Sequence, residues 1–518
     1  MKKNIVLNYD EVIDICKKII NRPELQSVSA SEEKIGETIS GIPINKYSMG
    51  NGEKHIVVSG AVHGSELIST DFVLNLMNEL SNNPEKMESL SEYTLDFIPV
   101  VNPEGYIITS TAVQKMVPKD EKERDTFYNK YYWAYRLDDQ IQISINKNNP
   151  AAVKIDEIPE EFPDLKQKAI DFRDRADGSV KLHQQMFENV TWEDIPDKYP
   201  ELKANLKRLY EKYNYPAGAM IDWSANGEGI DLNANSEYNT KIKDILDGKE
   251  LYNNFRHSNL KTSDPGPINC PFDREKGFEI TLENVALGGL LEKMHERDEL
   301  SAYFNYHGTG AMVYQRPLEI PEKLKDRNIK LDEKTIQNYL TSKFYSEKTF
   351  DVRNKNKYRI LTGNGKATSA NDIFRLLYPN DILVELSGRG GNPIAPFYNE
   401  NGSYNEIINS NIDGFINAVQ VLSLSDKVAK SANKVINKIG FMGEDELKEF
   451  EEKRVNDNEE TTPVWNNNGD DLALKKYEVL DMVYDEFSKR LDQLNENKEK
   501  VNSKIEKNAK QNKDDNER

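Results

Sequence analysis

A histidine and a glutamate stand three residues apart at His63 and Glu66, directly after the short apolar run of residues 56–62. An imidazole and a carboxylate at this spacing could close on one Zn²⁺, which takes nitrogen and oxygen ligands at about 2.0–2.2 Å. Such a pair also arises often by chance, with the histidine capping a helix and the glutamate in solvent. The pair therefore needs support from other parts of the chain.

Two further apolar runs end in residues of the same types. Residues 300–306 lead into His307, and residues 382–384 lead into Glu385, each before glycine-rich sequence. The carboxyl ends of parallel strands meet at one edge of a sheet, so these residues would lie beside the His-x-x-Glu pair. That arrangement predicts three metal ligands, His63, Glu66 and His307. A fourth position would stay open for water, as catalytic zinc requires, and Glu385 is left to act as a base.

Hydrophobic spacing indicates the elements that would hold these residues. β-Branched residues at 55–62 predict a buried strand, and the spacing after Glu66 is helical. Other expected strands lie at 41–48 and 93–101, the second followed by a turn at 102–106 that its proline and glycine indicate. Expected helices lie at 8–22, 275–299 and 332–347, and residues 411–422 should close the domain.

Over about residues 8–422 the chain resembles the zinc metallocarboxypeptidases of the carboxypeptidase A-like type. The resemblance rests on the His-x-x-Glu motif, on residues 97–106 and 229–233, and on His307 and Glu385 in the family's order. It implies an α/β fold with a mixed, mostly parallel twisted sheet flanked by helices, and Zn²⁺ as the cofactor. It also implies a zinc-dependent hydrolase of peptide or peptide-like amide bonds, in which Glu385 is the general base.

The substrate-binding residues depart from the family pattern. The family places an arginine, which holds the substrate's terminal carboxylate, directly after the asparagine of its Asp-x-Asn element, whereas Ala234 follows Asn233 here. A second family arginine often precedes the glycine of this element, and Glu228 stands in that place. Alanine offers no substitute for a bidentate guanidinium. Asn233 could still hydrogen-bond the substrate.

Other residues could complete the substrate site. Arg389, four residues after Glu385, could replace the missing arginine, as could Arg359, Arg316 or a cation of the insertion described below. The family's tyrosine, which closes over the substrate, should fall about twenty residues before Glu385. Ungapped counting puts an asparagine there, and Tyr358 could serve only if the loop is shifted.

Three functions stay open from these departures. If another cation holds the substrate's terminal carboxylate (a rebuilt clamp), the chain would be a carboxypeptidase. Without one it could be an endopeptidase or amidase, and residues 391–393 resemble those of relatives that cut D-glutamyl bonds in cell-wall peptides. It could also be a non-catalytic zinc-binding or peptide-binding relative. In each case the expected partner is a peptide or a peptide-like molecule.

Composition limits the other partners and the location. The chain has 69 Lys and Arg against 88 Asp and Glu, a formal charge of −19, which disfavours nucleic acid and anionic membranes as partners. Its two cysteines, Cys16 and Cys270, form no disulfide framework. No signal-peptide segment and no apolar run of membrane-spanning length stand out, so we expect a cytoplasmic protein. Members of the family are often secreted, which makes this a departure.

The expected organisation is a catalytic domain with two additions. Residues 1–422 would form the zinc carboxypeptidase-like domain, with an insertion at about 107–222 whose aromatic stretch, 127–136, either packs on the core or forms a lid. Residues 423–494 read as a helical extension with a linker at 455–469, and residues 495–518 as a disordered tail. The apolar stripe of the helix at 477–494 could dock on the domain or allow self-association.

Overall fold

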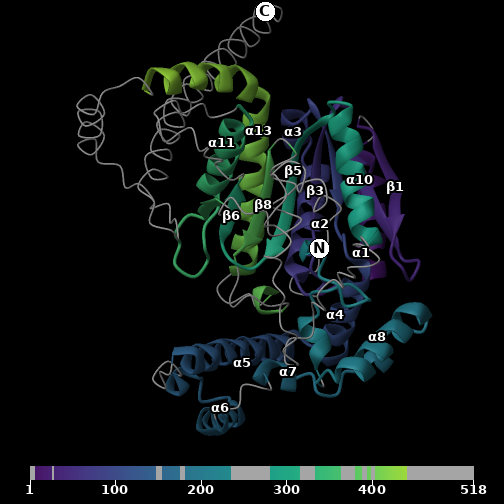
Figure 1. Cartoon of the computed structure of the whole chain (residues 1–518), viewed down its shortest axis with the longest axis vertical. Helices are drawn as coiled ribbons and strands as arrows, with labels where there is room; N and C mark the ends of the chain where they lie inside the picture. The colour runs from purple at the N-terminus through teal and green to yellow at the C-terminus, as the bar shows by residue number, and fades with distance from the viewer. Residues whose placement is uncertain are drawn as a thin grey trace, which may run out of the picture.

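An eight-stranded sheet forms the centre of the molecule (Figure 1). The computed structural model describes residues 6–25, 28–147, 154–175, 181–216, 218–234, 281–315, 333–362, 378, 380–387, 394–397 and 403–439. Within them the strands are β1 (Ala30–Glu37), β2 (Pro43–Met49), β3 (Lys54–Ser59), β4 (Tyr93–Ile98), β5 (Leu300–Gly308), β6 (Met312–Gln315), β7 (Arg359–Thr362) and β8 (Asp381–Leu386).

The strand order is β1-β2-β4-β3-β5-β8-β6-β7. The four central strands, β4, β3, β5 and β8, pair in parallel, and β7 pairs in parallel with β6. Antiparallel pairs add β1, β2 and β6 to this centre. The expected α/β fold with a mixed, mostly parallel sheet is therefore confirmed, and the carboxyl ends of β3, β5 and β8 lie side by side.

Helices cover both faces of the sheet. Those outside the insertion are α1 (Tyr9–Ile20), α2 (Leu67–Asn82), α3 (Pro84–Ser89), α4 (Pro103–Met116), α10 (Leu282–Glu296), α11 (Glu333–Lys348) and α13 (Ser403–Ile439). Ile56 and Val58 of β3 belong to a core that includes residues of α1, α2 and α13, whereas Val57 lies in a second core with α10. Because alternate residues of a strand point to opposite faces, we call these the α2 face and the α10 face.

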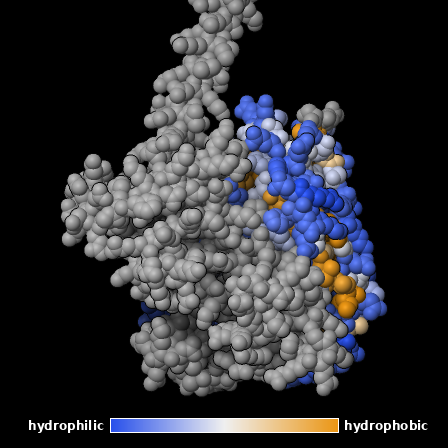
Figure 2. Space-filling view, turned by 45° about the horizontal axis from the view of Figure 1, so that its top comes forward, coloured by the Kyte–Doolittle hydropathy of each residue, from blue (hydrophilic) through white to orange (hydrophobic). Residues whose placement is uncertain are grey.

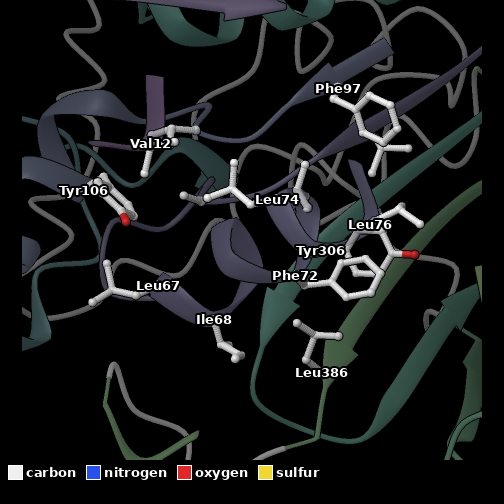
Figure 3. Packing of buried hydrophobic residues seen from close by; sticks show 14 of the residues in the cluster. Val12, Leu67, Ile68, Phe72, Leu74, Leu76, Phe97, Tyr106, Tyr306 and Leu386 are labelled. Atoms are coloured by element: carbon white, nitrogen blue, oxygen red, sulfur yellow. The ribbon is translucent and has the colours of Figure 1, made fainter. Parts of the chain in front are cut away.

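The α2 face is packed with large side chains (Figure 3). Phe72 of α2 lies against Tyr306 of β5, with 4.2 Å between the ring centroids. Phe304, another residue of β5 on this face, contacts the ring of Phe415 from α13 at 5.0 Å between centroids. Burial of such rings is favourable by about 25 cal/mol per Å² of apolar surface. The strands that end at the site are thus fixed by a close-packed layer on this side.

Three expected elements differ from the structure. The strand expected at 93–101 is β4, which stops at Ile98. The strand expected to reach residue 62 stops at Ser59, because the backbone leaves strand geometry at Ala61, which has a φ of 48°. The prediction of a turn at 102–106 was wrong. Asn102 instead caps the amino terminus of α4, accepting a hydrogen bond at 2.9 Å from the backbone N–H of Gly105. Pro103 occupies the first position of that helix, where proline is favoured.

The insertion is helical and lies beyond one end of the sheet, below it in Figure 1. Its helices are α5 (Glu121–Lys147), α6 (Pro163–Arg175), α7 (Leu182–Gln185) and α8 (Pro200–Tyr213). Tyr128 and Tyr131, from the aromatic stretch, are fully buried in the same core as α1 and α2. The expected packing of this stretch on the core is therefore present, and the lid stays a prediction, as do the domain boundaries.

The described carboxyl-terminal residues belong to α13, which extends past residue 422. The linker, the apolar-striped helix and the tail expected after it lie outside the described residues, as does Cys270. Cys16 is buried in α1. In the described part of the chain, no helix is both long enough and apolar enough to span a membrane. The coloured surface in Figure 2 is largely hydrophilic, in keeping with the 30% of charged residues.

Candidate metal and catalytic site

The turn after β3 carries the His-x-x-Glu pair, and its shape depends on Gly64. A Cβ at that position would stand 2.2 Å from the backbone carbon of Gly105, so no larger residue fits without moving α4. The N–H of Gly64 donates to the carbonyl oxygen of Ser224 at 3.1 Å. Glu66 then stands at the amino-terminal cap of α2. The turn is thus held between α4 and the segment that follows the insertion.

His63, Glu66 and His307 converge at the carboxyl ends of β3 and β5. Glu66 Oε1 lies 2.7 Å from His63 Nδ1, and Glu66 Oε2 lies 2.8 Å from His307 Nδ1. One nitrogen or oxygen from each of the three side chains lies within 4.8 Å of the others. The three residues chosen from the sequence as ligands are therefore together in space.

The donor set fits Zn²⁺, which binds imidazole nitrogen and carboxylate oxygen. Both histidines present Nδ1 toward the same carboxylate. Glu66 Oε2 is buried and makes no hydrogen bond, although it lies close to His307 Nδ1. A buried carboxylate oxygen without a hydrogen bond is costly in free energy, and a cation between these atoms would satisfy it. His63, Glu66 and His307 could therefore hold Zn²⁺.

Asp231 orients His63 from the side away from Glu66. Its Oδ1 lies 3.3 Å from His63 Nε2 and also accepts the backbone N–H of Asn233 at 2.9 Å. Burial alone would lower the pKa of His63, but Glu66 and Asp231 outweigh it and raise this pKa well above its usual value. The same negative surroundings favour a dication. A metal-binding histidine commonly gives its other N–H to a carboxylate, so Asp231 fits that role.

Asp231 is a site residue that the sequence did not indicate. It stands far from His63 in the chain, so no local pattern joins them. The Asp-x-Asn element could have indicated it, because Asp231 stands two residues before Asn233, the predicted substrate-binding residue.

Glu385 lies one strand away from His307. These two residues are register partners in the parallel pair of β5 and β8. Burial and the nearby Glu66 carboxylate raise the pKa of Glu385 to about 7, against the opposing effect of the two histidines. A general base works best when its pKa is close to the working pH. Both the position and the pKa of Glu385 suit a base beside the metal site.

The Asp-x-Asn segment faces the metal site without an arginine. Asn233 Nδ2 lies 2.9 Å from His63 Nε2, so its amide is within reach of the site. Ala234 ends the short 3₁₀ helix η6 (Leu232–Ala234). Glu228 is half-buried, and its N–H donates to the side chain of Asn226 at 3.0 Å. The role of Asn233 in substrate binding stays a prediction.

Tyr358 points into the protein. It is 2% exposed, and its hydroxyl accepts the N–H of Ser387 at 2.5 Å and the side-chain amide of Asn411 at 3.0 Å. To close over a substrate, it would have to leave both partners. That role stays a prediction, as does the role of Arg389, which lies outside the described residues.

Residues 21–154 match the family model described as zinc carboxypeptidase. The match confirms the resemblance to that family and supports a metallopeptidase. No curated protein matches the chain significantly.

Solved structures of metallocarboxypeptidases are also similar to this chain. Bovine thrombin-activatable fibrinolysis inhibitor, in complex with tick carboxypeptidase inhibitor, has 12% identity and a TM-score of 0.44, covering 82% of this chain and 98% of that one. Carboxypeptidase A from Helicoverpa armigera has 13% identity and a TM-score of 0.42, covering 83% and 75%. A metallo-carboxypeptidase from Burkholderia cenocepacia has 10% identity and a TM-score of 0.37, covering 81% and 70%.

Proposed function

We propose that this chain, which matches the zinc carboxypeptidase model over residues 21–154, hydrolyses peptide or peptide-like amide bonds with Zn²⁺ held by His63, Glu66 and His307. One observation carries the proposal: the three ligands converge at the end of β5, and Glu385 is the register partner of His307 on the next strand. Ligands and base thus stand together although they come from distant parts of the chain.

Each residue of the site would have a separate task. Bound Zn²⁺ would polarise the scissile carbonyl and lower the pKa of a water molecule. Glu385 would take a proton from that water and pass it to the leaving amine. Asp231 would hold the ring of His63 by its Nε2. Asn233, within reach of the same ring, would hydrogen-bond the substrate.

The position of the cleaved bond depends on what takes the place of the family's two arginines, since Ala234 and Glu228 stand at those positions. A clamp rebuilt from another cation would give a carboxypeptidase. An endopeptidase or amidase, for example one acting on cell-wall-type D-glutamyl peptides, would need no such clamp. The absence of arginine from these two places disfavours a strict copy of the family's exopeptidase site and is compatible with both of these functions.

Mass spectrometry of a peptide pool tests the function. The pool contains peptides with free and with amidated carboxyl ends, and peptides with D-glutamyl linkages. Removal of single residues from free ends alone would indicate a carboxypeptidase. Cleavage that ignores amidation would indicate the endopeptidase or amidase. No cleavage by protein shown to contain zinc would contradict the hydrolase and favour a zinc-binding or peptide-binding relative.

Glu385→Gln is the matched variant for this test, since it keeps the size of the side chain and removes the base. We expect cleavage to fall by about 10²- to 10⁴-fold, with the zinc content unchanged. Equal activity in Glu385→Gln and the natural protein would remove Glu385 from the mechanism. A cytoplasmic location and self-association through the carboxyl-terminal helix stay predictions.

A further inference from the structure

One row of residues runs across the sheet from the metal site to its edge. His307 on β5 pairs with Glu385 on β8, Glu385 pairs with Met312 on β6, and Met312 pairs with Arg359 on β7. Neighbouring strands lie 4.7–4.9 Å apart, so the Cα atoms of Glu385 and Arg359 are about 10 Å apart. Arg359 was one of several candidate cations in the sequence, and the register places it in line with the base.

The four side chains of the row share the α10 face. The residues next to them in the chain, Tyr306, Val384, Val313 and, directly before β7, Tyr358, all belong to the core of the α2 face. Because alternate residues point to opposite faces, the row points the other way. A Cβ on Gly310 would meet both Met312 Cε, at 2.7 Å, and Glu385 Cβ, at 3.0 Å, which places those two side chains together.

Exposure increases along the row. His307 is buried, Glu385 and Met312 are half-buried, and Arg359 is exposed. A ligand that reaches the metal site from this edge of the sheet would therefore pass Arg359. Met312 lies between the cation and the base as an apolar contact surface.

The guanidinium of Arg359 is available to a ligand. Among the described residues, no hydrogen bond or ion pair involves its side chain. Arg353, six residues earlier, is different: its Nε and Nη2 bind both oxygens of Asp351, at 2.7–3.0 Å. Since Arg353 is occupied and Arg359 is not, the second is the cation that a carboxylate could bind in a bidentate way.

The carboxyl groups around the metal site make such a cation favourable for binding an acidic substrate. Glu66, Asp231 and Glu385 are carboxyl groups beside the histidines, and the chain as a whole has a formal charge of −19. A substrate carboxylate would be repelled there unless a positive group received it. The family's position for that group is filled by Ala234.

We propose that Arg359 binds a carboxylate of the substrate, the role that the family gives to the arginine at the position of Ala234. The proposal rests on the proposed function, since it assigns the substrate class of the same site: peptides with a free carboxylate on the β7 side of the cleaved bond. That carboxylate is either the terminal group of the peptide or the side chain of a terminal acidic residue.

Peptide affinity tests the proposal separately from hydrolysis. The zinc-loaded Glu385→Gln protein, in which cleavage is slowed, is titrated calorimetrically with three blocked tetra-alanine peptides: one with a free carboxyl end, one amidated, and one amidated with a terminal glutamate. Arg359→Gln is expected to weaken binding of the preferred carboxylate peptide by about 10- to 100-fold, as loss of a charge-assisted hydrogen bond predicts. Binding of the neutral amidated peptide should not change.

The three peptides separate the two sources of the carboxylate. Tight binding of the free-ended peptide alone assigns a terminal carboxylate to Arg359, and tight binding of the glutamate peptide alone assigns an acidic side chain. Arg359→Lys, which keeps the charge but loses the planar fork, should give an intermediate affinity. Lys355→Gln is the control, because Lys355 pairs with Glu406 of α13 at 2.6 Å, and the variant removes one positive charge on the α2 face.

Three results would overturn the proposal. The first is unchanged affinity of Arg359→Gln for both carboxylate peptides. The second is an equal loss in Lys355→Gln, which would show a general charge effect. The third is a loss in Arg389→Gln instead, which would assign the carboxylate to Arg389. If the natural protein cleaves nothing, the proposed function fails, whereas these affinities still decide the role of Arg359.

Discussion

Glu385 is the residue whose protonation should control activity. Burial and Glu66 raise its pKa to about 7, and a nearby Zn²⁺ would lower it again by favouring the charged form. The base works only when deprotonated. We therefore expect kcat/KM to rise with pH and to level off at or below about pH 7. A profile that falls over this range would show that activity requires a protonated group, and it would contradict Glu385 as the general base.

Asp231 should matter for metal affinity, because it contacts His63 Nε2 and not the metal itself. We expect Asp231→Ala to weaken zinc binding by about 10- to 100-fold, which is typical when such a partner is removed. Competition with a chelator of known affinity measures this. Asp194→Ala, which removes a partner of Lys115 at 2.7 Å outside the site, should leave the zinc affinity unchanged.

The convergence of the proposed site residues was predictable from the sequence because His63, His307 and Glu385 each end an apolar run and Glu66 stands three residues after His63. The strand pattern fixes where His63, His307 and Glu385 stand along their strands, and parallel pairing brings strand ends together. The contact of Asp231 with His63 was not predictable, because it depends on where the chain re-enters the domain after a long insertion. The alignment of Arg359 with Glu385 was not predictable either, because it depends on the register of two strand pairs, one of them antiparallel.

At the scale of elements, the end of β8 is anchored by residues from two other segments. Ser387, two residues after Glu385, gives its N–H to Tyr358 and its hydroxyl to Asp351 Oδ1 at 3.1 Å. Its Oγ also accepts the N–H of Val352 at 3.0 Å. The strand pairing on β5 ends at Leu386, so these bonds hold the backbone where the ladder stops. They should fix the direction of Glu385.

Tyr358→Phe is expected to lower kcat by about 10-fold or more while leaving KM and zinc content nearly unchanged, since small displacements of a catalytic group are costly. Steady-state kinetics and faster hydrogen exchange at Ser387 check this. Tyr345→Phe is the matched control: it removes a buried hydroxyl from the same Asn411, to which Tyr345 donates at 2.7 Å, without touching Ser387. Equal effects of the two variants would contradict a positioning role.

The elements that the sequence missed share a physical reason. Seven of the eight residues of β1 are charged or small, and most are exposed, so no alternation of apolar residues marks this edge strand. β6 and β7 have only four residues each, too few to show a period. The helix α4 was missed because the Asn-Pro-Glu-Gly sequence is typical of a turn as well as of a capped helix start.

At the scale of the whole molecule, a buried histidine joins helices α5 and α7 of the insertion to the segment that leads into Asp231. His183 of α7 contacts Asp138 of α5 through Nδ1, at 2.5 Å, and Asp222 through Nε2, at 2.7 Å. Asp222 ends the 3₁₀ helix η5 (Ala219–Asp222), shortly before Asp231. Burial alone would lower the pKa of His183, but the two carboxylates outweigh it and raise this pKa to about 9.

This contact predicts a loss of stability at alkaline pH. The pKa of His183 in the folded chain exceeds the usual 6.5, so the stabilisation is complete below about pH 6.5 and is lost as the pH rises through about 9. The shift corresponds to about 3 kcal/mol. The Tm should fall over this range in the natural protein and much less in His183→Gln, which is also less stable at pH 6. Parallel Tm curves for the two proteins would contradict the prediction.

The way in which the metal site is assembled also bears on how the protein matures. Its two histidines, its carboxylate ligand and its base come from the ends of three strands that are widely separated in sequence, and the contacts that unite them are among the most non-local in the sheet. Closing such long loops is slow and entropically costly. A chain still emerging from the ribosome therefore has no complete zinc site until its central strands have paired. We therefore expect zinc binding to occur only after the central strands have paired. The bound ion would then stabilise the folded chain by linking distant segments, in the way that a disulfide would.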